Sequence, residues 1–95
     1  MREFYSDSDI DILVEMDDVF TDGVFVHSNV KNFSMSKYKK FHRVWEEVLV
    51  RLRMEGWRHV YAIPPSSKEE KWQRMFGFKG TGIEVSSYKL MILEL

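Results

Sequence analysis

The sequence SKYKKFHRVWEEVLVRLRMEG, residues 36–56, is the clearest pattern in the chain. Its large apolar residues recur three and four positions apart, which places them on one face of a helix. They are Phe41, Trp45, Val48, Leu49 and Leu52. Ser34 or Ser36 is positioned to cap the start, and Gly56 suits the left-handed backbone position that follows a helix end. The pattern therefore predicts a helix of roughly 20 residues.

Short apolar and β-branched runs flank this helix. Residues 10–16 (IDILVEM) and 23–30 (GVFVHSNV) are separated by turn-forming residues, so they predict an antiparallel pair of strands. Residues 57–63 (WRHVYAI) predict an inner strand. This strand ends at Pro64, because proline has no amide hydrogen to donate to a neighbouring strand.

The C-terminal third of the chain predicts one more helix and two more strands. The residues SSKEE, 66–70, form a doubled capping box that begins a short helix, and Gly77 ends it. Residues 78–85 and 87–95 then predict two strands. The expected result is one α+β domain over residues 1–95 with the order β-β-α-β-α-β-β.

The charges of the chain are divided between its two ends, although 14 Lys and Arg nearly balance 15 Asp and Glu. Residues 1–22 hold eight acidic residues and one basic residue, which defines an acidic N-terminal segment. Basic residues are densest from Lys31 to Arg43. Such a stretch either attracts a phosphate-bearing partner or forms a solvated helix face. Nucleic-acid binding is the weaker expectation, because the acidic segment would repel DNA.

The composition excludes several classes of protein. Without cysteine there is no disulfide framework, no thiolate catalysis and no cysteine-ligated metal. Asp7, Asp9 and Asp11 lack the glycine and the closing glutamate of a calcium loop, so we expect no metal site. No apolar run approaches the length of a membrane span, and the N-terminus does not follow the order of a signal peptide. We therefore expect a cytoplasmic protein with no membrane contact.

Two stretches resemble the GCN5-related N-acetyltransferase (GNAT) family. Residues 72–78 (WQRMFGF) are similar to its short helix that ends in a Gly-Phe turn, and residues 88–95 (YKLMILEL) are similar to its last strand. The resemblance covers about residues 20–95. It implies a GNAT-like mixed sheet without the family's N-terminal helical part, with acetyl-CoA bound between two splayed strands. The chain also resembles small phage-encoded acetyltransferase-like proteins, some of which are virion or head-associated components.

The resemblance implies which residues would meet substrate and cofactor. His27 lies where the family often has a general base. Apart from the resemblance, Tyr61 and Tyr88 are hydroxyls that could act as the acid, with Tyr61 the one expected near the cleft, and packing within the strand is the alternative for each side chain. Gln73 stands where the family often has a tyrosine that protonates the departing thiolate, and the loop 31–36 lacks the glycines of the family's pyrophosphate loop. The cofactor phosphates would lie at the start of the long helix, against Ser34, Met35, Ser36, Lys37, Lys39 and Lys40.

Two functions follow, and the residues leave open whether the protein is an enzyme. The first is a reduced, acyl-CoA-dependent N-acyltransferase. The alternative is a non-catalytic protein of the same fold that acts in a phage virion, in assembly or on a host factor. In both cases we expect a protein partner or a homo-oligomer, because the part of the fold that builds the family's acceptor site is missing. The expected location is the host cytoplasm or the virion.

Overall fold

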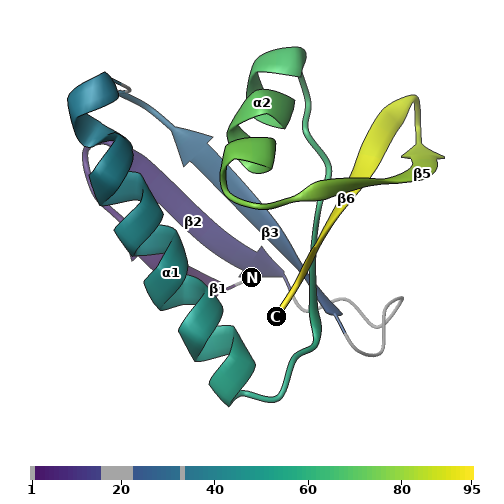
Figure 1. Cartoon of the computed structure of the whole chain (residues 1–95), viewed down its shortest axis with the longest axis horizontal. Coiled ribbons are helices and arrows are strands. Elements are labelled where there is room, and N and C mark those ends of the chain that lie inside the picture. The colour runs from purple at the N-terminus through teal and green to yellow at the C-terminus, as the bar shows by residue number, and fades with distance from the viewer. Residues whose placement is uncertain (1, 16–22, 33) are drawn as a thin grey trace.

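The computed structural model describes residues 2–15, 23–32 and 34–95. These residues form a six-stranded sheet and two helices (Figure 1). In chain order the elements are β1 (Arg2–Ser6), β2 (Ile10–Glu15), β3 (Gly23–Val30), a 3-10 turn η1 (Met35–Lys37), α1 (Tyr38–Met54), β4 (His59–Ala62), α2 (Ser67–Met75), β5 (Lys79–Val85) and β6 (Tyr88–Glu94). The strand order is β1-β2-β3-β4-β6-β5. Among the described strands only β3 and β4 pair in parallel, so the expected α+β class with a mixed sheet is confirmed.

Strand β1 corrects the expected order, which began with residues 10–16. It pairs antiparallel with β2, so the described elements run β-β-β-α-β-α-β-β. Phe4, its buried residue, packs against Arg51 with the guanidinium 4.2 Å from the ring centroid. Arg2 Nη1 also lies 2.7 Å from Glu55 Oε1. The start of the acidic segment is thus an edge strand held by α1, while residues 16–22 lie outside the described part of the chain.

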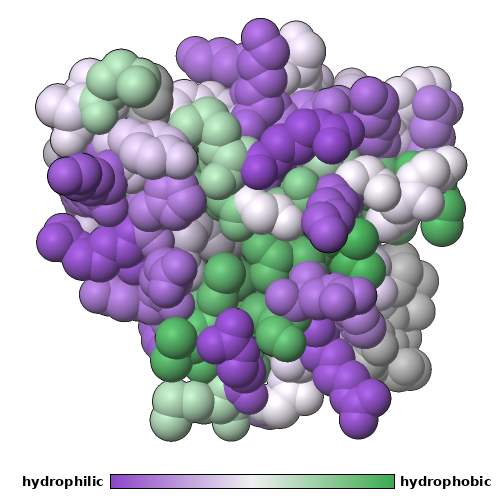
Figure 2. All heavy atoms as spheres, in the orientation of Figure 1, coloured by the Kyte–Doolittle hydropathy of each residue, from purple (hydrophilic) through white to green (hydrophobic). Residues whose placement is uncertain are grey.

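Both helices cover the same face of the sheet (Figure 1). Val24 and Val26 of β3 point into the core beneath them. The rings of Phe41 on α1 and Trp72 on α2 meet edge to face, with centroids 6.3 Å apart. Figure 2 shows hydrophilic side chains over the outer side of α1 and an apolar area between its C-terminal half and the end of the chain. The alternate residues of each strand point to the opposite face, which we call the open face.

The long helix has the expected length but a different start. Residues 35–54 are helical, and Gly56 follows with φ of 93°, as expected. Ser34 makes no side-chain capping bond. Instead, its hydroxyl lies 2.8 Å from the hydroxyl of Ser36. The expected serine cap is therefore wrong, because the two hydroxyls bond each other rather than a backbone amide.

The short helix follows its sequence signals closely. The Ser66 hydroxyl accepts a hydrogen bond from the amide of Glu69 at 3.2 Å, and Gly77 has φ of 102°. The expected capping box and glycine stop are thus confirmed.

Both edge strands carry an irregularity in their pairing. In β1 the register shifts between residues 3 and 5, and in β5 it shifts between residues 80 and 84. The Thr81 hydroxyl fills the second irregularity, since it donates to the carbonyl of Leu90 at 2.9 Å and accepts from the amide of Ile83 at 3.1 Å.

Candidate functional site

The two parallel strands in the middle of the sheet separate after a short paired stretch. Residues 23–25 of β3 pair with residues 59–61 of β4. Beyond Phe25 and Tyr61, β3 continues to Val30 while β4 ends at Ala62. Figure 1 shows the two strands diverging, β3 toward the N-terminus of α1 and β4 toward the N-terminus of α2.

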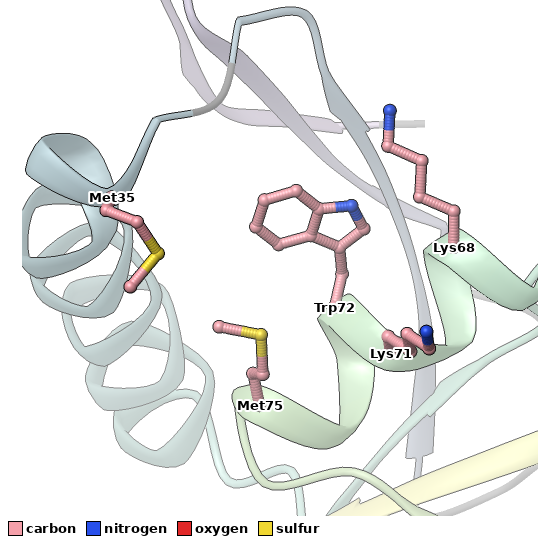
Figure 3. A pocket seen from close by; sticks show the side chains of 5 residues that line it. All are labelled: Met35, Lys68, Lys71, Trp72 and Met75. Atoms are coloured by element: carbon pink, nitrogen blue, oxygen red, sulfur yellow. The ribbon is translucent and has the colours of Figure 1, made fainter.

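A pocket of about 260 Å³ lies between η1 and α2 on the helix side of this separation. Its lining residues are Met35, Lys68, Lys71, Trp72 and Met75. Figure 3 shows the indole of Trp72 between Met35 and the side chain of Lys68, with Met75 below it. Met35 is 79% exposed and Met75 is 40% exposed. Exposed apolar side chains that line a pocket form a surface on which a ligand can bind.

The pocket combines these apolar walls with positive charge. Lys68 and Lys71 are both exposed. Within the described ranges, neither ammonium group has an ion-pair partner. The two side chains are therefore free to meet an anionic ligand at the edge of the pocket.

Two of the lysines expected to bind phosphates are instead bound by aspartates. Lys37 Nζ lies 2.8 Å from Asp9 Oδ1. Lys40 Nζ lies 2.6 Å from Asp7 Oδ2 and 2.8 Å from Asp9 Oδ2. Lys39 is exposed, and no described acidic group pairs with it. Asp7 and Asp9 thus neutralise Lys37 and Lys40, and a phosphate bound by these two lysines would have to displace a carboxylate.

The ion pairs between the aspartates and the lysines shift the pKa values of Asp7, Asp9 and Lys40. Lys40, and then the hydroxyl of Tyr5, hold the pKa of Asp7 well below its usual range. Hydrogen bonds from Lys37 and Lys40 likewise lower the pKa of Asp9. The same contacts, that with Asp7 first, raise the pKa of Lys40. Each carboxylate is stabilised in its charged form by donated hydrogen bonds.

The expected catalytic residues His27 and Tyr61 share the open face of the sheet. Tyr61 pairs with Phe25, and His27 is two residues further along β3, so all three point to the same side. The Tyr61 ring lies over Gly23 and 5.9 Å from the ring of Phe25. His27 Nε2 lies 2.9 Å from Oε2 of Glu15. The expected cofactor residues lie around η1, on the helix side.

Sequence reasoning did not identify Glu15 or the two pocket lysines as site residues. The signal for Glu15 is weak, because it meets His27 only through the register of β2 and β3. Lys68 and Lys71 could have been identified from the sequence, because residues three and four positions apart are neighbours on a helix surface. This spacing places both lysines near Trp72.

Two further features bear on function, a metal-binding group and a membrane-spanning helix. The described residues contain no group of three or more His, Asp or Glu side chains placed to hold a metal ion. None of the helices described here has the length and apolar character needed to cross a bilayer.

Comparison with known proteins bears on the fold. No family model matches the chain, and no curated protein matches it. The crystal structure of a domain from Methanocaldococcus jannaschii DSM 2661 is similar, with a TM-score of 0.62 and 17% sequence identity. The match covers 90% of this chain and 55% of that one, so this chain spans just over half the length of its structural neighbour. At this identity the likeness extends to the fold alone.

Proposed function

We propose that the chain binds acyl-CoA and transfers the acyl group to an amine, as the resemblance to GCN5-related N-acetyltransferases implies. The observation that carries the proposal is the separation of β3 and β4 past Phe25 and Tyr61, beside an apolar pocket between η1 and α2. In that family the cofactor lies between two splayed strands. Here β3, α1 and β4 follow one another in the order that such a site requires.

The chemistry of the pocket suits the nucleotide end of the cofactor. The indole of Trp72 and the thioethers of Met35 and Met75 offer an apolar, polarisable surface for a purine ring. Lys68 and Lys71 offer charge for phosphates. A volume of about 260 Å³ lies just below the range of roughly 300–1,000 Å³ for small-molecule sites. The pocket would therefore hold part of the cofactor, and its acyl end would pass between the strands toward His27.

Calorimetric titration with acetyl-CoA tests the proposal. The double variant Lys68→Gln, Lys71→Gln removes two charges but keeps most of each side chain. We expect micromolar binding by the unmodified chain and roughly tenfold weaker binding by this variant. The control, Arg58→Gln with Lys79→Gln, removes the same charge from exposed residues outside the pocket and should bind normally. Absence of heat at millimolar acetyl-CoA would refute the proposal.

A second candidate is a binding protein of the same fold without catalysis, such as a phage virion, assembly or host-interaction protein. The ion pairs of Lys37 and Lys40 favour it, because they leave less charge for a cofactor. Gln73 favours it too, since this buried side chain has no titratable proton with which to protonate a thiolate. This candidate predicts a protein partner or a homo-oligomer, which light scattering and affinity capture would detect, and no release of thiol from acetyl-CoA.

A further inference from the structure

We propose that Glu15 is a positioning residue for His27, and that Nδ1 of His27 is the nitrogen that takes a proton from the acceptor amine. The inference rests on the proposed function, because it assigns a role at the same separation of β3 and β4. It adds a residue and a tautomer that the resemblance does not imply.

The contact between the two side chains is set by strand register. His27 lies opposite Leu13, and Glu15 lies opposite Phe25, so Glu15 and His27 are diagonal neighbours on the open face. Glu15 Oε2 is 2.9 Å from His27 Nε2. The side chains are 45% and 50% exposed, so the pair is open to a substrate from solvent.

The carboxylate decides which ring nitrogen carries the proton. An ionised carboxylate only accepts hydrogen bonds, so Nε2 of His27 must be the donor and carry the hydrogen. In the neutral ring the lone pair is then on Nδ1. Within the described residues Nδ1 has no hydrogen-bond partner, so this nitrogen is available as a base.

His27 lies on β3 just beyond the stretch that pairs with β4. The pairing with β4 ends at Phe25, and His27 is the next residue on the open face. Among the described strands, none therefore pairs with β3 on the β4 side of His27. In the proposed complex, the amine would approach Nδ1 from the open face, and the thioester would come from the pocket on the helix side.

The proposed step needs no co-reactant beyond the two substrates. The amine nitrogen attacks the acyl carbon, a C–N bond forms, and the C–S bond breaks with its electron pair leaving on sulfur. His27 Nδ1 takes the amine proton, and Glu15 stabilises the resulting imidazolium through Nε2. The proton then passes to the thiolate or to water.

Other titratable groups share the open face with the imidazole of His27, but their contacts are with other residues. From β2, Asp11 shares the open face, but it accepts from Ser6 and pairs with Lys31 at 3.0 Å. From β4, Tyr61 and His59 stack near each other, with centroids 6.2 Å apart.

Nitrogen-15 NMR of the histidine rings tests the tautomer without any cofactor. Above the pH at which imidazole loses its charge, we expect His27 of the unmodified chain to carry its hydrogen on Nε2. Glu15→Ala should give a mixture of tautomers. Glu84→Ala removes an exposed glutamate from β5 and should leave the spectrum unchanged. A spectrum that is the same with and without Glu15 would overturn the inference.

Thiol release from acetyl-CoA, with butylamine as the acceptor, tests the role in the reaction. The chain has no cysteine, so a thiol reagent reports only released CoA. We expect His27→Asn to lower kcat by about 100-fold or more, and Glu15→Ala by about tenfold, with KM for acetyl-CoA unchanged. Glu15→Asp should keep more of the kcat than Glu15→Ala does, and Glu84→Ala should leave kcat unchanged.

The outcomes separate this inference from the proposed function. Absence of acetyl-CoA binding in calorimetry would refute the proposed function. Binding of acetyl-CoA without thiol release in the presence of butylamine would refute the transfer step of the proposed function, and this inference with it. Thiol release that does not depend on Glu15 and His27 would overturn this inference alone.

Discussion

Replacing Gly23 by alanine places a methyl group where the ring of Tyr61 already lies. Gly23 pairs with His59 at the start of the parallel stretch of β3 and β4. A Cβ atom there would stand 2.7 Å from Cδ2 of Tyr61, and closer still to Cε2. It would also lie 3.2 Å from the carbonyl oxygen of His59. Carbon atoms pack best at about 3.5–4.0 Å, so the ring must turn or the strands must move apart.

Two opposing terms give the size of the effect. Inserting a methyl group into a filled space costs about 1–3 kcal/mol. Alanine restricts the unfolded chain more than glycine does, which returns about 0.4–1 kcal/mol. Taking the middle of both ranges, the net expected loss is about 1.3 kcal/mol in the free energy of unfolding. For a domain of this size each kcal/mol lowers Tm by about 4–8 °C.

Urea unfolding followed by circular dichroism measures this loss. Gly80→Ala is the matched control, because a Cβ there would lie 3.6 Å from Nη2 of Arg74, which is ordinary contact. It should cost nothing. In a Tyr61→Ala background, Gly23→Ala should lose most of its effect, because the ring is gone. An equal loss with and without the Tyr61 ring, or no loss in the unmodified chain, would refute the reasoning.

Three further measurements test other parts of the structure. Ser66→Ala should cost about 0.5–2 kcal/mol in urea unfolding, whereas Ser34→Ala, which removes no capping bond, should cost far less. Because the folded-state pKa values of Asp7 and Asp9 lie below the ordinary 3.8, the unfolded chain binds protons first, and stability should fall as pH drops below that value. The double variant Asp7→Asn, Asp9→Asn should be less stable at pH 7 and show a flatter acid profile by the same assay. Leu52→Ala, at a position with no exposed surface, should lower the free energy of unfolding by about 2–5 kcal/mol, and a drop below 1 kcal/mol would contradict the assigned core.

Local patterns were enough to predict most of the fold. The periodicity of α1, the capping box of α2 and the glycines at 56 and 77 act within a few residues, so their meaning does not depend on the rest of the chain. Strand β1 escaped prediction for the opposite reason. Its sequence REFYS has one buried residue and no regular alternation, and Phe4 is held by Arg51, which is 47 positions away.

The candidate site was less predictable because it depends on distant partners. The sequence alone shows that basic residues cluster at the start of α1. It does not show that Lys37 and Lys40 donate hydrogen bonds to Asp9, which is 28 and 31 positions away. One sequence gives no sign of such a pairing. The contact of Glu15 with His27 likewise depends on the register of two strands across residues 16–22. The pocket beside Trp72 forms only when η1 and α2, which are far apart in the sequence, lie side by side.

The irregular pairing of β1 and β5 bears on how this sheet meets other copies of itself. A regular outer strand offers a row of unused amides and carbonyls on which a further strand can build, and this is the first step toward fibrils. Here each outer strand breaks its register, β1 near residue 4 and β5 around Thr81, whose hydroxyl already engages the amide of Ile83. The hydrogen bonding of the sheet therefore stops at both edges, and copies crowded at high concentration would meet through side chains rather than through a continuous ladder.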